Sequence, residues 1–112
     1  MKRSPWPWLP AASLMGMIFF LSSLTNLPVP LRFPHADKAV HAAIYGGLTA
    51  ALLLPGLSPA RAWGAAALYG ATDEFHQRFV PGRDASVGDW LADAAGAAAV
   101  SVGAWAWRRR RS

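Results

Sequence analysis

The chain has 112 residues, of which 54% are hydrophobic and 15% are charged, so it forms at most one domain and is short of surface charge for a water-soluble protein. It contains no cysteine, which excludes a disulfide framework, a thiolate metal site and a cysteine nucleophile. The net charge is +5, but four of the eleven basic residues are consecutive, at 108–111, and follow a Trp-Ala-Trp triplet. Aromatic residues followed by arginines are typical of a membrane edge. The other basic residues are scattered without a nucleic-acid-binding motif, so we expect no nucleic-acid partner.

The first predicted helix covers residues 8–24, an apolar segment of about 17 residues that is just long enough to cross the hydrocarbon core of a bilayer. Lys2 and Arg3 precede it and should stay on the cytoplasmic side. A cleaved signal peptide is the competing interpretation, but no clear small-residue cleavage site follows and the rest of the chain is equally apolar. We therefore expect this segment to remain as a membrane span.

Three further helices are predicted at residues 38–54, 59–77 and 87–107, and helix-breaking residues separate them. Three prolines within residues 25–37 disfavour helix, and a Pro-Gly pair follows both the second and the third helix. Ser58 is the predicted N-cap of the third helix, with a proline at the first helical position. The chain is therefore expected to alternate four helices with three short connections.

The placement of basic residues predicts the topology. Clusters at the two ends of the chain favour four spans with both termini in the cytoplasm, although Arg32, Arg78 and Arg83 in the outer loops reduce the asymmetry. Without an internal repeat or a linker, residues 1–112 should form a single unit. The expected fold class is all-α, an integral membrane four-helix bundle.

Polar residues gather along one face of the second and third predicted helices. On the second helix Asp37, His41 and Tyr45 follow at four-residue intervals, and Lys38 lies within the same arc of roughly 100°. The third helix has a similar polar face, formed by Tyr69, Asp73, His76 and Gln77, with Glu74 at its edge. Both faces lie at the end of the helix that should point outward.

The fourth predicted helix adds a third polar face. It begins after Ser86, a predicted N-cap, and Asp89 and Asp93 share one face with Gly96. In a four-span topology the start of the second helix, the end of the third and the start of the fourth all lie at the outer interface. Because ionisable groups in lipid cost several kcal/mol unless they are paired or hydrated, we expect the three faces to converge on one outward-facing polar site.

The residue types leave the nature of this site open. Five acids placed against Lys38, Arg83 and histidines allow either a neutralised network or a cation site, and oxygen and imidazole ligands suit zinc, manganese or magnesium. A structural interpretation treats Asp37, Lys38, Arg83 and Asp89 as helix caps and ion pairs at the membrane edge. The cofactor and the identity of any metal therefore remain open.

A functional interpretation is stronger for Asp73, Glu74 and His41, because paired carboxylates beside an imidazole suit general acid-base chemistry. These three are the candidate catalytic residues. The two tyrosines and Gln77 are expected to hydrogen-bond the carboxylates. The six tryptophans fall near span ends, where indoles favour the interface, and Gly96 and Gly103 are interpreted as helix contacts.

Two motifs, "DKAVHAAIYGGL" at residues 37–48 and "DEFHQRFVPGRDASVGDWLADAAG" at residues 73–96, closely resemble the VanZ-like family of small bacterial membrane proteins. The resemblance covers about residues 12–105. The positions that match the family pattern are Asp37, Lys38, His41, Tyr45, Asp73, Glu74, Gln77, Pro81, Gly82, Arg83, Asp89, Asp93 and Gly96. Asp93 stands where the family has Asn, which adds a negative charge when the residue is ionised.

The resemblance implies a multi-pass protein of the bacterial cytoplasmic (inner) membrane and an association with resistance to the glycopeptide teicoplanin. We expect the polar site to act on, bind or sense a cell-envelope component. The candidate substrate-binding residues are Lys38, Arg83, Asp37, Tyr45, Gln77, Asp89 and Asp93.

Three functional hypotheses follow. In an enzymatic one, Asp73, Glu74 and His41 hold a metal or shuttle a proton, while Lys38 and Arg83 bind an anionic lipid-linked headgroup such as that of a cell-wall precursor. In a non-enzymatic one, the same charges bind lipid headgroups or a partner protein, or only stabilise the bundle. Passage of protons or ions is disfavoured because the inner halves of the helices offer no polar relay. A homo-oligomer is compatible with so short a chain.

Overall fold

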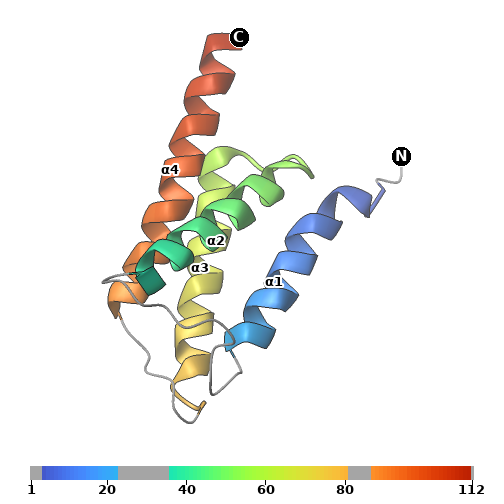
Figure 1. Cartoon of the computed structure of the whole chain (residues 1–112). Helices are drawn as coiled ribbons and strands as arrows, with labels where there is room; N and C mark the ends of the chain where they lie inside the picture. The colour runs from blue at the N-terminus through green and yellow to red at the C-terminus, as the bar shows by residue number, and fades with distance from the viewer. Residues whose placement is uncertain (1–3, 23–35, 81–86, 112) are drawn as a thin grey trace.

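The computed structural model describes residues 4–22, 36–80 and 87–111, without the side chains of residues 22 and 36–38. Within these residues the fold is all-helical and has no strand, which confirms the predicted helical class with four helices (Figure 1). A short 3-10 helix precedes them. The elements are η1 (Trp6–Trp8), α1 (Leu9–Ser22), α2 (Ala36–Leu53), α3 (Pro59–Gln77) and α4 (Val87–Arg111).

The turn between α2 and α3 forms for local reasons that the sequence predicts. Gly56 adopts a positive φ of 110°, which glycine reaches without steric cost. Ser58 then caps α3, because its side-chain oxygen accepts a hydrogen bond from the backbone N–H of Arg61 at 3.2 Å. Pro59 occupies the first turn, where its missing N–H leaves no hydrogen bond unmade. The chain therefore reverses within a few residues.

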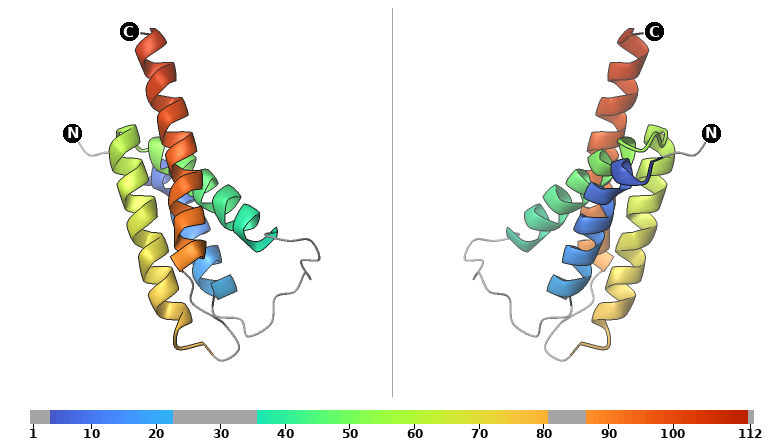
Figure 2. Two further views of the ribbon diagram at one scale, coloured as in Figure 1. Left: turned by 90° about the vertical axis from the view of Figure 1, so that its left-hand side faces the viewer. Right: turned by 90° about the vertical axis from the view of Figure 1, so that its right-hand side faces the viewer.

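Helices α2, α3 and α4 pack against one another, and α1 lies against α2 and α3. Helices α3 and α4 run antiparallel, so the last turns of α3 and the first turns of α4 lie at the same end of the molecule (Figure 2). The start of α1 and the end of α4 point toward the opposite end, and the last turns of α4 extend beyond the other helices (Figure 1).

The crossing of α2 and α4 depends on Gly96. A Cβ atom built on Gly96 would lie 2.1 Å from the backbone oxygen of Ala42, a distance that no side chain can occupy. Gly46 is also close to α4, since its Cβ would lie 3.3 Å from the backbone oxygen of Gly96. The prediction of a helix contact is thus confirmed for Gly96. It is wrong for Gly103, where no described atom would lie within 4 Å of a Cβ.

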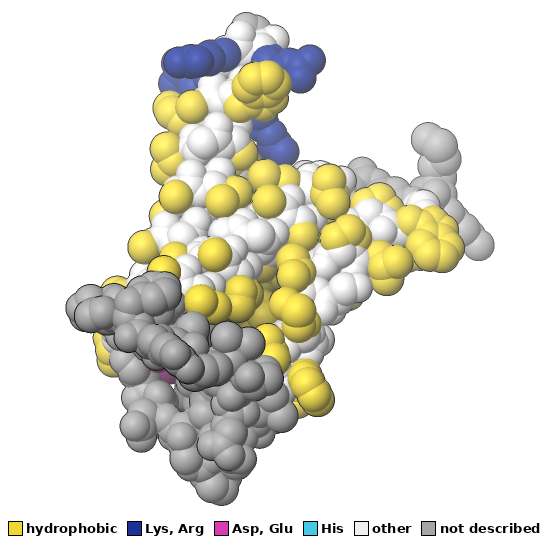
Figure 3. All heavy atoms as spheres, viewed as in Figure 1, with side chains coloured by type: hydrophobic (Ala, Val, Ile, Leu, Met, Phe, Trp, Pro, Cys, Tyr) yellow, Lys and Arg dark blue, Asp and Glu magenta, His cyan; other side chains and the backbone are white. Residues whose placement is uncertain are grey.

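Most of the buried apolar residues are alanines, whereas many large apolar side chains point outward. The buried apolar residues are Ala11, Ile18, Tyr45, Leu48, Ala51, Leu52, Ala62, Ala66, Ala67 and Ala97. In contrast, Leu68, Phe75 and Val102 are each more than 60% exposed, at 68%, 62% and 62%. Apolar side chains cover much of the face shown in Figure 3. Large apolar side chains thus lie on the surface of the molecule as well as in its core.

Four membrane spans are predicted, at residues 8–24, 38–54, 59–77 and 87–107. Helix α1, which corresponds to the first predicted span, has 14 residues. Helix α4 has 25 residues because the terminal arginines continue it. Among the described residues, no helix is both long and apolar enough to cross a membrane. Membrane insertion and the location of the termini therefore stay predictions.

Gly96→Ala tests the contact between α2 and α4. The added methyl group would collide with the α2 backbone, so we expect the free energy of unfolding to fall by about 1–3 kcal/mol. Gly103→Ala, on the same helix, is the control, and its better helix propensity should leave stability unchanged or raise it by up to about 1 kcal/mol. Denaturant titration of both variants measures the difference. Equal effects would contradict the close contact.

Candidate functional site

Acidic side chains line the interior at the end of the molecule where α3 stops and α4 starts. Asp73 and Glu74 in the last turns of α3 are 7% and 8% exposed. Asp89 and Asp93 in the first turns of α4 are 9% and 0% exposed. The antiparallel arrangement of the two helices brings these pairs to the same end of the bundle (Figure 1), and ligand atoms of Glu74 and Asp93 lie within 4.8 Å of each other. Together with His41 of α2, these four acids are called the polar cluster below.

His41 joins the polar cluster through a direct bond to Asp93. Its Nδ1 lies 2.7 Å from Asp93 Oδ1, and the two side chains are 17% and 0% exposed. An ionised carboxylate only accepts hydrogen bonds, so the imidazole N–H is the donor. The bond spans the α2–α4 crossing, where Ala42 follows His41 and Gly96 lies less than one turn after Asp93. The close backbone contact therefore brings the two side chains within reach.

Some buried polar atoms in this region make no hydrogen bond to any atom that the structure describes. They include Asp93 Oδ2 and the hydroxyl oxygen of Tyr45, a residue that is 1% exposed. Gly70 lies next to both residues, since a Cβ built on it would be 3.1 Å from Asp93 Oδ2 and 3.4 Å from Tyr45 Cε1. A side chain at position 70 would fill this space. The sequence offers no signal for this role of Gly70.

His41, Glu74 and Asp93 come from three helices and each offers one potential ligand atom, and these atoms all lie within 4.8 Å of one another. One imidazole and two carboxylates form a donor set that suits divalent transition metals. The same geometry suits proton transfer, because Asp93 orients the imidazole ring of His41 and the second ring nitrogen of His41 can accept a proton. Of the predicted catalytic residues, the structure thus brings His41 and Glu74 together with Asp93, and Asp73 lies in the adjacent position of α3.

The tyrosines do not bind the carboxylates as predicted. The hydroxyl of Tyr69 donates to the backbone oxygen of Met15 at 2.5 Å and so connects α3 to α1. Tyr45 makes no hydrogen bond to a described carboxylate. The prediction is therefore wrong for Tyr69, because its side chain faces α1 and not α4. Gln77 is buried at 3% exposure, and its hydrogen bond to a carboxylate stays a prediction.

Two tryptophans have a role that sequence reasoning missed. Trp63 Nε1 of α3 donates to the backbone oxygen of Ala94 at 3.1 Å, and Trp90 Nε1 of α4 donates to that of Ala67 at 3.0 Å. These reciprocal bonds hold α3 and α4 side by side next to the polar cluster, since Trp90 lies between Asp89 and Asp93 on α4. In the sequence both indoles lie near predicted span ends, which indicates a position at the membrane–water interface and not a bond between helices.

The remaining predicted binding residues are ones whose side chains the structure does not describe. Asp37 and Lys38 lie in the first turn of α2, but their side chains are outside the description. Arg83 lies outside the described residues altogether. Their expected roles in binding an anionic headgroup therefore stay predictions, as does the catalytic role of Asp73.

Comparison with known proteins identifies one family. The model of the VanZ/LLP1 family matches residues 7–108, which is nearly the whole chain. No curated protein and no solved structure matches the chain.

A double-mutant cycle tests the His41–Asp93 bond in metal-free protein. His41→Ala alone leaves a buried carboxylate without its partner, so we expect a loss of about 3–5 kcal/mol in unfolding free energy. In the Asp93→Ala background, the same change should cost about 1.5–3 kcal/mol less, which is the strength of a hydrogen bond to a charged group. Denaturant titrations of the four proteins give the coupling. Additivity within about 0.5 kcal/mol would contradict the pairing.

Proposed function

The chain belongs to the VanZ/LLP1 family, and we propose that it is a multi-pass protein of the bacterial cytoplasmic membrane whose polar cluster binds a cell-envelope component. The observation that carries the proposal is the convergence of His41, Glu74 and Asp93 from three helices inside an otherwise apolar chain. Burying charged groups is costly, so a bundle with no use for them would be more stable with apolar residues in their place.

The distribution of side-chain sizes supports a membrane environment. Large apolar groups on all four helices face outward, including Phe20, Leu68, Phe75 and Val102, while the four acids of the polar cluster and several alanines face the interior. In water such a surface would favour aggregation. In lipid it is the expected arrangement, because helices there associate through small residues and keep ionisable groups inside.

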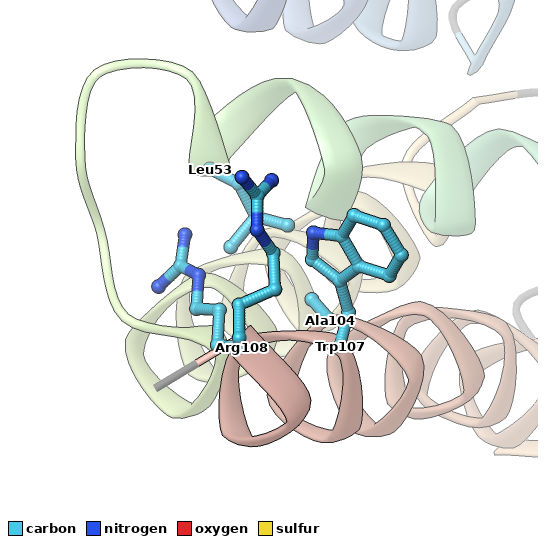
Figure 4. Close-up of a pocket in the computed structure, with 5 residues that line it drawn as sticks. Leu53, Ala104, Trp107 and Arg108 are labelled. Carbon is cyan, nitrogen blue, oxygen red and sulfur yellow. The ribbon is translucent and has the colours of Figure 1, made fainter.

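The C-terminal end of α4 supports the orientation. The guanidinium of Arg109 lies 5.0 Å from the Trp105 ring centre and that of Arg111 lies 5.4 Å from the Trp107 ring centre. A shallow pocket lined by Leu53, Ala104, Trp107, Arg108 and Arg111 lies between the ends of α2 and α4 (Figure 4). Indoles and arginines at one level suit the cytoplasmic interface, where anionic headgroups attract them. The polar cluster then faces the outer leaflet.

The ligand that fits this end best is a lipid-linked, anionic envelope component such as a cell-wall precursor. Lys38 and Arg83 supply positive charge near the start of α2 and just before α4, and charge-assisted hydrogen bonds to a phosphate are among the strongest that side chains make. The carboxylates of the polar cluster can accept hydrogen bonds from hydroxyl or amide groups of the same ligand. Binding of such a component is the route by which we propose that the protein contributes to teicoplanin resistance.

A metal-dependent enzyme acting on the same lipid-linked substrate is the second candidate. The specific observation in its favour is the short distance between the ligand atoms of His41, Glu74 and Asp93, within 4.8 Å. Turnover of a lipid-linked substrate that stops on chelation would distinguish it from simple binding.

Cysteine labelling tests the membrane topology. The chain has no cysteine, so Ser4→Cys and Phe79→Cys each introduce a single thiol, at positions that are exposed at opposite ends of the molecule. We expect a membrane-impermeant maleimide to label Phe79→Cys in intact protoplasts and Ser4→Cys only after permeabilisation. The reverse pattern would contradict the orientation, and recovery of the protein outside the membrane fraction would contradict insertion.

Teicoplanin susceptibility tests the function. In a sensitive Gram-positive host, expression of the wild type should raise the inhibitory concentration above that of the empty vector. Asp73→Asn, which removes one buried charge with little change in shape, should return it to the vector level. The control is the isosteric change Thr72→Val at the exposed neighbouring position, which should keep the wild-type value.

Membrane protein levels decide how this result is interpreted. Equal levels of wild type and Asp73→Asn assign the loss of resistance to the site. Resistance that persists in Asp73→Asn, or that falls only in proportion to protein level, would count against a functional role of Asp73.

A further inference from the structure

His41, Glu74 and Asp93 combine one imidazole and two carboxylates from three different helices, with one ligand atom of each within 4.8 Å of the others. We propose that these three residues bind a single divalent transition-metal ion, for which zinc fits the donor set best. The inference deepens the proposed function, on which its biological role rests, by naming a cofactor for the same polar cluster. It differs from the metal set predicted from the sequence in using Asp93 in place of Asp73.

The buried atoms beside the trio point independently to a missing ligand. Asp93 is 0% exposed, and its Oδ2 makes no hydrogen bond within the described part of the chain. A buried carboxylate oxygen without a partner is destabilising, and a metal ion can serve as that partner. Gly70 leaves room beside this oxygen, since a Cβ atom at position 70 would lie 3.1 Å from Oδ2.

Tyr45 supplies a second unused polar group on the same side. Its hydroxyl is buried, makes no hydrogen bond to a described atom, and belongs to the turn of α2 that follows His41. Three protein ligands are the usual number in zinc sites that keep a position open for water or substrate. The Tyr45 hydroxyl is therefore available to a molecule in that open position.

Charge and protonation are compatible with a divalent ion. Two ionised carboxylates and a neutral imidazole sum to two negative charges, which one divalent cation balances. The His41–Asp93 hydrogen bond at 2.7 Å describes the metal-free arrangement. Ligation through Nδ1 would displace the proton that His41 shares with Asp93 and would leave the Asp93 carboxylate to bind the same ion.

The test measures zinc binding to the purified full chain in detergent. After removal of metal with a chelator, equilibrium dialysis against zinc alone, followed by elemental analysis, should give one zinc per chain. His41→Gln and Glu74→Gln should each weaken binding by at least tenfold. The matched control is His76→Gln, which changes the same residue type on α3, where the ring packs 4.6 Å from that of Phe19. It should bind zinc like the wild type.

A second measurement needs no variant and so remains valid if the substitutions impair folding. Cobalt added to the metal-free wild type should develop visible absorption bands of a low-symmetry site with nitrogen and oxygen ligands, and equimolar zinc should remove them. A spectrum identical to that of aqueous cobalt would overturn the proposal. So would zinc binding that is the same in His41→Gln, Glu74→Gln and wild type, because the ion would then bind elsewhere.

Failure of this inference can be told apart from failure of the proposed function. Zinc binding is measured without lipid or antibiotic, whereas the susceptibility assay requires no knowledge of the metal. Absence of zinc binding together with loss of resistance in Asp73→Asn overturns the metal site alone. Zinc binding in a protein that confers no resistance upholds the metal site and overturns the proposed role in resistance.

Discussion

The backbone contact between Gly96 of α4 and Ala42 of α2 determines how close these two helices lie, and the interior depends on that distance. With any other residue at position 96 the helices would separate, since a Cβ would lie 2.1 Å from a backbone oxygen. His41 precedes the contact on one helix and Asp93 lies close to it on the other, so their 2.7 Å bond exists only at this separation. The close packing of α2 against α4 and the His41–Asp93 hydrogen bond thus depend on the same point in the structure.

The interior is built from two kinds of residue that contribute differently to stability. Alanines such as Ala62, Ala66 and Ala97 are 0% exposed but bury little apolar area each. The polar cluster opposes folding because carboxylates lose their hydration. Side-chain hydrogen bonds to backbone acceptors also connect the helices. Ser101, for example, donates to the backbone oxygen of Pro59 at 2.7 Å.

Local signals predicted much of the fold. The third helix runs over residues 59–77 as expected, because a serine cap, a proline and a glycine mark its start within the sequence itself. The four-residue spacing of the polar residues and the alternating direction of the helices predicted that the polar faces converge. The predictions that failed are those that depend on how one helix is oriented about its axis relative to its neighbour. Tyr69 shares a helical face with Asp73 in projection, yet its hydroxyl reaches α1. Gly70 and the paired indoles give no sequence signal, since their roles depend on which neighbour they meet.

The two indole bonds between α3 and α4 have a mechanical consequence. Trp63 pairs with Ala94 and Trp90 with Ala67, so the two bonds sit one helical turn apart on each helix and run in opposite directions. Sliding of α3 along α4, or rotation of either about its axis, would break both bonds at once. Because each of these two helices carries two acids of the polar cluster, the paired indole bonds also fix the positions of Asp73 and Glu74 relative to Asp89 and Asp93.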